Sequence, residues 1–449
     1  MLTRREFLAG LGLFAAAIVF PVKLLESDAK LEAEKAAARE PLLCDWVIDN
    51  VLIVDGSGEP GFRGRVAVKG EKIVGVGEFP FAAEVKVIDG QGLVLAPGFI
   101  DIHTHTEDYV YSGGEMSPFL SQGVTTQIGG NCGRSPQDIE GYFQTIPRLS
   151  INYGLLMGYA TLRKKVRGRD RGGKTTLAEL TKMQQYLEQA LKEGAVGLSI
   201  GLEYWPQTDA TTEEIMALCE VVKETGGFYA THIRSEYDDV LAAVEEAIKI
   251  GSKAGVPVQY SHLKAGYERN WPKLPRILEM LSEAEAGGLD ISADLYAYTY
   301  SSTDLGRKSF SPSMSEENIE LAAAHPLTFF ASDSGIYAGG RATHPRAYGH
   351  IPRILGRLVR EKKVLSLEAA IAKLTSRPAR RLKLKNRGLL KKGYQADLVL
   401  FDAETIIDRA TREKTTLFSE GVRHVWVNGN LAWSEGKLLN AGSGQVINN

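Results

Sequence analysis

The sequence lacks the features that mark several classes of protein. Its 53 basic and 55 acidic residues leave a net charge of −2 over 449 residues. No basic excess is therefore available to neutralise phosphates, which excludes nucleic acid as the obvious partner. Three cysteines cannot build a disulfide framework. No stretch reaches the roughly 18 to 20 apolar residues of a confident membrane span, and we find no internal repeat. The 44% of apolar residues is nevertheless ample for a globular core.

The first forty residues are expected to direct the protein to its location rather than to take part in the fold. TRREFL at residues 3–8 precedes an apolar run from Ala9 to Val22, and this pattern is similar to a twin-arginine export signal. Residues 26–41 are charged and alanine-rich, as in a spacer. We therefore expect export to the periplasm. The alternative is an N-terminal membrane anchor, because no clear small-x-small cleavage site follows the run.

Both ends of the remaining chain have the pattern of a small β domain. Short Val- and Ile-rich segments separated by glycine turns fill residues 45–96, and the same pattern recurs in residues 396–437. We expect the two pieces, at residues 41–96 and 385–449, to pair into one β-sandwich domain. Residues 1–40 are the export signal and spacer, and residues 97–384 form a separate central domain.

The central domain alternates between strand-like and helical segments. Two of its helices are predicted from their start signals: Thr176 makes a capping box with Glu179, and Thr211 is followed three residues later by Glu214. Eight apolar strand-like runs recur, at residues 98–105, 123–130, 154–160, 195–201, 227–233, 256–264, 289–298 and 326–333. Eight strands with intervening helices predict a parallel sheet closed into a TIM-like (β/α)8 barrel of the α/β class. The active site of such a barrel lies at the carboxyl ends of its strands.

Metal-ligand side chains stand at those strand ends. Alternation along a strand places His103 and His105 on one face, and the other four such residues close later runs. The six are His103, His105, Cys132, His232, His262 and Asp333. Imidazole, thiolate and carboxylate together favour zinc over magnesium or calcium. We therefore predict a zinc site at the mouth of the barrel.

The remaining cysteines and histidines fall outside this pattern. Cys219 lies on an apolar helical face and is expected to fill the core, whereas the role of Cys44 stays undetermined. The other histidines are expected to be structural or peripheral; they are His325, His344, His350 and His424.

The sequence also resembles a known family. PGFIDIHTH at residues 97–105 looks like the opening motif of the amidohydrolase superfamily, and GYQADLV at 393–399 resembles its return to the β domain. More specific segments resemble the N-acyl-D-amino-acid deacylases, from about Asp45 to the C-terminus. They are GGNCG at 129–133, GLEY at 201–204, ATHIR at 230–234, SHLKA at 261–265, SD at 332–333 and HPRAYG at 344–349.

The resemblance implies a role for each site residue. Cys132, His232 and His262 would hold a tightly bound zinc, and His103, His105 and Asp333 would surround a possible second, weaker position. Asp333 would also act as the catalytic acid and base. The substrate would be a small molecule with a free carboxylate, bound by Lys264 and Arg346 with help from Tyr296, Ser302 and Tyr204. The expected reaction is hydrolysis of an N-acyl-D-amino acid by metal-activated water.

Two departures from the family pattern leave alternatives open. Only residues 299–332 separate Tyr298 from Asp333, so the lid that the family usually carries there is short or absent. Tyr159 also stands where the family often has histidine. A cyclic-amide or D-terminal dipeptide hydrolase therefore stays an alternative, and a non-catalytic binding protein is a further one. The oligomeric state is not indicated by the sequence.

The export prediction can be tested by replacing the paired arginines. In the double variant Arg4→Lys, Arg5→Lys we expect the protein to stay in the cytoplasm, because a receptor reads the arginine pair itself. Cell fractionation measures the outcome. Unchanged periplasmic delivery would favour the membrane anchor or another export route.

Overall fold

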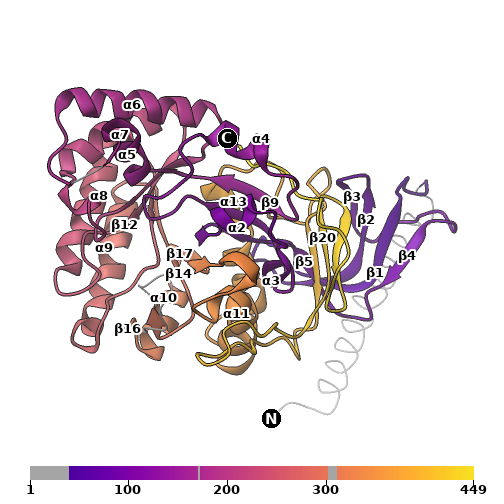
Figure 1. Ribbon diagram of the computed structural model, residues 1–449. Coiled ribbons are helices and arrows are strands. Elements are labelled where there is room, and N and C mark those ends of the chain that lie inside the picture. Colours follow the sequence, from indigo (N-terminus) through magenta and orange to yellow (C-terminus); the bar gives the residue numbers. More distant parts are fainter. Residues whose placement is uncertain (1–39, 170–171, 302–310, 449) are drawn as a thin grey trace, which may run out of the picture.

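The computed structural model describes residues 40–169, 172–301 and 311–448. A barrel surrounded by helices occupies one end of the molecule and a β domain occupies the other (Figure 1). The export signal predicted within residues 1–40 lies almost wholly outside the described residues. Among the helices that the structure describes, none is both long and apolar enough to cross a membrane.

The predicted barrel is confirmed, and each of the eight apolar runs contains a strand. Strands β6, β8 and β9 form one parallel segment, and the following strands form a second of six strands. Leu156 separates the two segments. The bounds are β6 Phe99–Asp101, β8 Val124–Gly129, β9 Asn152–Leu155, β10 Met157–Gly158, β11 Gly197–Gly201, β12 Phe228–His232, β13 Val258–Tyr260, β14 Ile291–Leu295 and β17 Thr328–Phe330.

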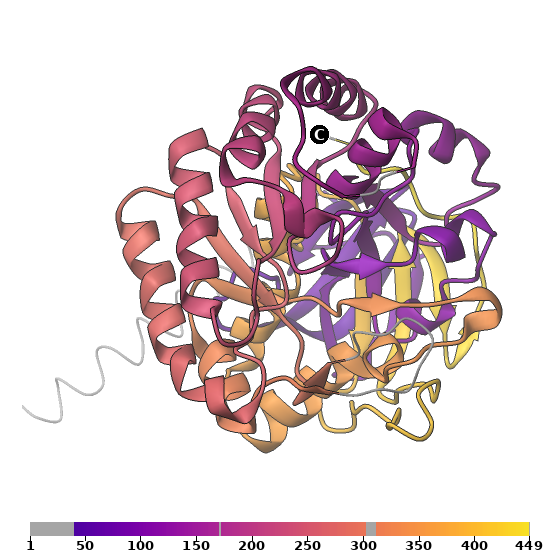
Figure 2. The same cartoon turned by 60° about the vertical axis from the view of Figure 1, so that its left-hand side comes forward.

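Helices cover the outside of these strands, as Figure 2 shows from the side. The helices are α2 Glu107–Tyr111, α3 Ser117–Leu120, α4 Ile139–Thr145, α5 Tyr159–Arg167, α6 Leu177–Lys192, α7 Thr212–Thr225, α8 Val240–Ala254, α9 Leu274–Ala286, α10 Glu316–Ala324, α11 Arg346–Arg353, α12 Leu367–Leu374 and α13 Ser376–Arg381. A π-helical segment at Ile354–Glu361 extends α11, and short 3-10 turns lie at Gln207–Asp209, Glu268–Lys273 and Ala338–Gly340.

Both predicted helix starts are confirmed. The Thr176 hydroxyl accepts a hydrogen bond from the Glu179 amide, and the Glu179 carboxylate accepts one from the Thr176 amide. The Thr211 hydroxyl also accepts from the Glu214 amide, at 3.2 Å, but the Glu214 carboxylate accepts from the Tyr159 hydroxyl and does not complete a capping box. Cys219 lies in the buried face of α7 and fills the core as expected.

The barrel closes differently at its seam, between the first and last strands. No strand ladder joins β17 to β6 in the described structure. The carboxylate of Asp101 instead accepts hydrogen bonds from the amide and hydroxyl of Ser332, at 2.9 and 2.5 Å. Beyond that point, two-residue strands β7 (Thr104–His105) and β18 (Ser334–Gly335) pair in parallel. The seam is therefore fastened at the carboxyl ends of the strands.

The β domain is built from an early and a late segment of the described chain, the indigo strands and the yellow strands that lie side by side in Figure 1. The last residues return to the barrel, where the Ile447 amide donates to the Tyr153 carbonyl of β9 at 2.9 Å. Its nine strands form one continuous sheet in the order β22-β21-β20-β19-β5-β1-β2-β3, with β4 beside β1. The bounds are β1 Trp46–Ile53, β2 Phe62–Lys69, β3 Lys72–Gly77, β4 Lys86–Asp89, β5 Val94–Pro97, β19 Leu398–Phe401, β20 Val422–Val427, β21 Asn430–Ser434 and β22 Lys437–Leu438. The antiparallel pairing of β19 with β5 joins the two ends.

This sheet rolls over its own apolar core, so the two layers of the sandwich are two halves of one sheet. The rings of Trp46 in β1 and Trp426 in β20 stack 5.6 Å apart, although two strands separate β1 from β20 in the sheet. A β-carbon on Gly429 would lie 2.2 Å from the carbonyl oxygen of Gly70. Only glycine therefore allows the turn after β20 to approach the turn after β2 so closely.

A buried polar network joins the β domain to the barrel. The Asp397 carboxylate pairs with the Arg387 guanidinium and accepts hydrogen bonds from the Asn428 amide and from Nδ2 of Asn152 in β9, at 2.8 and 3.2 Å. Arg387 Nη2 also donates to the side chain of Asn428 at 2.9 Å. These four residues are each less than a tenth exposed. A buried charge is stable only while its partner is present.

We therefore expect Asp397→Asn to lower the free energy of unfolding by about 3 to 5 kcal/mol, because Arg387 would stay buried without its counter-charge. Denaturant unfolding of the metal-loaded protein measures the loss. The control is Glu283→Gln at the exposed pair with Arg276, where both side chains are about half exposed and the midpoint should not change. Equal stability of the two variants would contradict this role for Asp397.

Candidate metal centre

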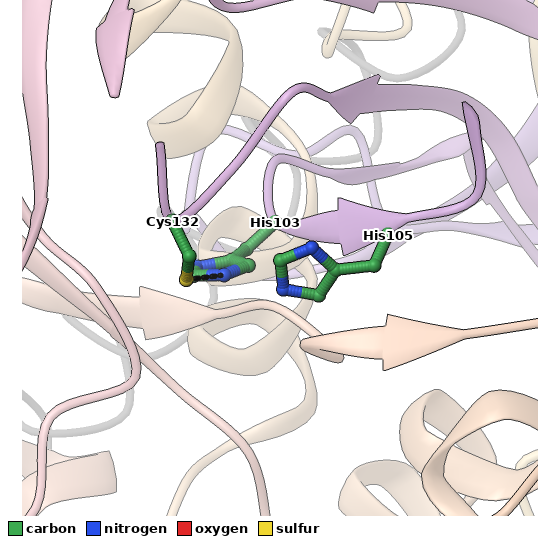
Figure 3. Close-up of side chains that lie close together, drawn as sticks. All are labelled: His103, His105 and Cys132. Atoms are coloured by element: carbon green, nitrogen blue, oxygen red, sulfur yellow. Dashed lines mark hydrogen bonds between the residues drawn. The ribbon is translucent and has the colours of Figure 1, made fainter. Parts of the chain in front are cut away.

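The structure gathers all six predicted metal ligands at the carboxyl ends of the barrel strands. They come from five places in the chain that converge at the mouth of the barrel: the turn from β6 to β7, the loop after β8, the end of β12, the turn after β13 and the turn after β17. Figure 3 shows His103, His105 and Cys132 with their side chains directed toward one another. All six residues are buried except His105, which is partly exposed.

The donor atoms lie close enough to share a metal ion. Three groups of three ligands have all their donor atoms within 4.8 Å of one another. The groups are His103, His105, Cys132; then Cys132, His232, His262; and finally His103, His262, Asp333. The Cys132 sulfur lies 3.5 Å from His103 Nε2 and 3.6 Å from His262 Nε2. Because Cys132 belongs to two groups, the geometry offers two neighbouring positions that share the thiolate.

Three of these ligands have a left-handed backbone. The φ angles are 51° at Cys132, 39° at His262 and 49° at Asp333. Non-glycine residues rarely adopt this conformation, and it is concentrated at functional sites. Each turn is held by its surroundings: the His262 amide donates to Asp294 Oδ1 at 2.8 Å, and the Asp333 amide donates to the His103 carbonyl at 2.9 Å.

The strand alternation expected at this site is wrong in detail. Strand β6 ends at Asp101 and β13 ends at Tyr260, so His103 and His262 lie beyond their strands. Their side chains meet through turns rather than through a regular pleat. The rings of His103 and His105 are nevertheless only 5.4 Å apart, because β7 pairs with β18 across the seam.

Three carboxylates that the sequence analysis missed lie behind the imidazoles. His103 Nδ1 is 3.3 Å from Asp294 Oδ1, His232 Nε2 is 3.1 Å from Glu203 Oε2, and His262 Nδ1 is 2.7 Å from Glu236 Oε1. Each imidazole thus turns one nitrogen to the centre and the other to a carboxylate. This arrangement fixes the ring and raises its basicity toward a metal. Asp294 is the last residue but one of β14 and lies inside the seventh apolar run, so a search for polar side chains near the ends of strands could have found it.

The local charges keep Cys132 in the form that binds metal. Burial alone would raise the pKa of Cys132, but the charge of His103 and hydrogen bonds from the neighbouring imidazoles hold it well below its usual range. Burial lowers the pKa of His105, yet hydrogen bonds to Asp333 and Cys132 outweigh it and raise the value to about 9. The thiolate is the metal ligand, so the donor set fits zinc.

Asp333 and Arg346 form a buried ion pair beside the ligands. One oxygen of Asp333 lies 3.2 Å from His105 Nε2, and the other lies 2.8 Å from Arg346 Nη1. Burial would raise the pKa of Asp333, but the charges of Arg346 and His262 hold it well below its usual range. Asp333 is therefore ionised at neutral pH.

A cavity of about 540 Å³ opens onto this pair. Tyr204 and Arg346, both predicted to bind substrate, line it together with His105, Cys132 and Asp333. His344, expected to be structural or peripheral, also lines it. Its buried ring accepts a hydrogen bond from the Arg346 amide at 3.1 Å and lies 3.1 Å from the Tyr300 carbonyl oxygen, which fits the structural role.

The other predicted substrate residues lie around Arg346 or outside the described chain. The Arg346 guanidinium stacks 4.7 Å from the centre of the Tyr296 ring, and Lys264 Nζ lies 5.6 Å from the same centre. Lys264 Nζ also donates to Glu236 Oε1 at 2.7 Å, which ties it to the carboxylate behind His262. Ser302 falls outside the described residues. Tyr159 is buried away from the ligands and donates to Glu214 at 2.6 Å.

Comparison with known proteins gives consistent results. The model of the amidohydrolase family matches residues 86–325 and 305–432. The N-acyl-D-aspartate deacylase of Alcaligenes xylosoxydans xylosoxydans is 35% identical over 91% of this chain and 95% of its own length. The crystal structure of the N-acyl-D-glutamate deacylase from Bordetella bronchiseptica, complexed with zinc and a phosphonate inhibitor, has a TM-score of 0.85 and 31% identity, covering 91% of this chain and all of that one. The L-hydantoinase of Arthrobacter aurescens has a TM-score of 0.67 but only 17% identity over 91% of this chain and all of its own, which shows the fold alone.

The shared thiolate can be tested by metal analysis. We expect the purified protein to hold one to two zinc ions per chain and Cys132→Ala to lose the tighter one, because a thiolate and two imidazoles form a strong zinc set. Cys219→Ala removes a buried thiol of the core and should keep the full zinc content. A Cys132→Ala protein with as much zinc as the Cys219→Ala protein would contradict the assignment.

Proposed function

The chain belongs to the amidohydrolase family and, within it, to the N-acyl-D-amino-acid deacylases, and from this membership we propose that it is a zinc-dependent hydrolase that splits N-acyl-D-amino acids into a carboxylic acid and a D-amino acid. The observation that supports this most strongly is the buried Asp333–Arg346 pair, in which Asp333 is one of the six metal-ligand side chains and lies directly beside the other five. It places a base and a carboxylate-binding guanidinium at one end of a single cavity.

Cys132, His232 and His262 would hold the tighter zinc, and His103, His105 and Asp333 border the second position. Bound zinc supplies acidified water and polarises the amide carbonyl. The carboxylates of Glu203, Glu236 and Asp294 keep the three innermost imidazoles oriented toward the centre.

Asp333 carries the proton in this mechanism. Its carboxylate is ionised because of Arg346 and the imidazoles, so it accepts a proton from the attacking water. The protonated carboxyl then delivers that proton to the amide nitrogen as the carbon–nitrogen bond breaks. Without this transfer the leaving group would be an amide anion, which is a far poorer leaving group than a neutral amine.

Arg346 orients the substrate by binding its carboxylate. A guanidinium can hold a carboxylate with two parallel hydrogen bonds, and stacking on Tyr296 keeps the Arg346 plane fixed. Tyr204, whose ring centre lies 4.5 Å from that of His232, lines the same cavity. Lys264 adds positive charge while its ammonium balances Glu236. The wall of the cavity thus decides which enantiomer directs its amide toward Asp333.

Cyclic-amide hydrolysis on the same scaffold is the less favoured function. The likeness to the hydantoinase extends to the fold alone, whereas the sequence identity to the deacylases covers nine tenths of the chain. Hydrolysis of D-terminal dipeptides is compatible with the same carboxylate binding by Arg346, because such substrates also present the carboxylate of a D-amino acid.

As for location, we propose the periplasm on the basis of the paired arginines at residues 4 and 5.

The function is tested by measuring kcat/KM for both enantiomers of several N-acetyl amino acids. We expect a strong preference for the D form, because binding the carboxylate and the acyl oxygen leaves one side free for the side chain. Arg346→Ala should lose about 2 to 5 kcal/mol of transition-state stabilisation, the range for truncating one partner of a buried charge pair.

Two controls accompany this measurement. Cys219→Ala should keep wild-type kinetics, since its side chain lies on the buried face of α7 and does not line the cavity. Hydantoins serve as the competing substrate class. Equal rates on D and L forms, or faster turnover of hydantoins, would reject the deacylase.

A further inference from the structure

One polar group in the cavity wall has no partner in the described structure. The hydroxyl of Tyr337 is buried, yet no atom of the described residues accepts or donates a hydrogen bond to it. Tyr337 lines the same cavity as Asp333 and Arg346. Most buried hydroxyls in proteins are hydrogen-bonded, so an unpaired one in a substrate cavity requires an explanation.

The position of Tyr337 is held firmly by its own loop. Its amide donates to the Arg341 carbonyl at 2.9 Å, and its carbonyl accepts from the Gly340 amide at 3.0 Å. The Tyr348 hydroxyl from α11 then donates to the Gly340 carbonyl at 2.6 Å. The turn is therefore closed and anchored to the helix that carries Arg346, so the phenol is placed by the fold and not by chance.

The hydroxyl itself lies beside the seam. A β-carbon built on Gly335 in β18 would be 3.5 Å from the Tyr337 oxygen and 3.6 Å from the His105 carbonyl oxygen. Burial raises the pKa of Tyr337, and the nearby charge of Arg346 partly offsets this effect. The phenol is thus a neutral hydrogen-bond donor that lines the same cavity as His105 and the Arg346 guanidinium.

Arg346 also has a hydrogen-bond donor without a partner among the described residues. Its Nε is buried and makes no hydrogen bond to the described residues, while its Nη1 faces Asp333. A phenolic O–H and a guanidinium N–H that line one cavity both require an acceptor. An anionic group with two oxygen atoms can satisfy both.

We infer that Tyr337 donates a hydrogen bond to the substrate carboxylate alongside Arg346 and is a specificity-determining residue of this enzyme. The inference rests on the proposed deacylase function. It adds a residue from the loop after β18 that neither the strand-end pattern nor the family motifs include. A neutral donor beside a guanidinium favours a carboxylate over an uncharged carboxamide, because a charge-assisted hydrogen bond is about twice as strong as a neutral one.

The test compares Tyr337→Phe with the wild type on matched substrates. The first substrate is the N-acetyl-D-amino acid that the wild type hydrolyses fastest, and the second is its α-carboxamide. We expect kcat/KM to fall by about 10- to 100-fold for the acid, as when a hydrogen bond to a charged group is lost. For the carboxamide the fall should be threefold or less, since the interaction with the charge is already missing.

Thermal stability gives a second measurement, in which Tyr337→Phe should not be weakened although its activity falls. Tyr337→Phe removes a buried hydroxyl that has no partner, so the melting temperature of the substrate-free zinc enzyme should stay the same or rise. The matched control is Tyr109→Phe. The Tyr109 hydroxyl donates to the Glu115 carbonyl at 2.6 Å and does not line the cavity. That variant should melt at a lower temperature and keep wild-type kcat/KM.

Each result decides between distinct interpretations. Equal losses on acid and carboxamide would place the Tyr337 hydroxyl at the acyl group and overturn its assignment to the carboxylate. A lower melting temperature with unchanged kinetics would make it a structural residue. If the wild type hydrolyses no N-acetyl-D-amino acid, the proposed function itself fails. If the wild type is active and Tyr337→Phe equals it, only the inference about Tyr337 fails.

Discussion

Buried charges at the mouth of the barrel must be balanced by one another, and the rest of the site follows from this constraint. Glu236, Asp294, Asp333 and the Cys132 thiolate are each less than a tenth exposed. Lys264 and Arg346 supply only part of the compensating charge. Such groups are costly to remove from water unless every one of them is paired. The excess of acidic groups over fixed cations explains why the imidazoles gather there and why the donor set suits a divalent ion.

The same constraint explains which features the sequence reveals. Metal ligands of a barrel stand at strand ends, and strand ends are visible as the points where apolar runs stop, so the six donors could be found without coordinates. Helix starts were equally visible, because a capping threonine and a glutamate three residues later are local in the chain, as at Thr176 and Thr211.

Features that depend on distant contacts could not be predicted. Glu236, in the segment after β12, contacts His262, in the turn after the neighbouring strand β13, and nothing near Glu236 in the sequence distinguishes it from a surface glutamate. His344 and Tyr337 lie in an irregular loop whose path is set by α11 and by the seam. The rolling of the β domain depends on the close approach of Gly70 and Gly429, 359 positions apart. The local pattern of apolar residues along the chain does not indicate this contact.

The fastening of the seam has a consequence for the order in which the protein can assemble. His103 and His105 directly follow the first barrel strand, and Asp333 follows the last. The metal centre therefore lacks Asp333 until the ribosome has made most of the chain. The β domain is completed even later, because its strands β19 to β22 lie at Leu398–Leu438. A nascent chain can collapse as its early strands emerge, but a metal ion that bound then would meet Cys132 and the first histidines without the carboxylate that completes their surroundings. The barrel therefore closes, and the set of metal ligands is completed, in one late step of folding.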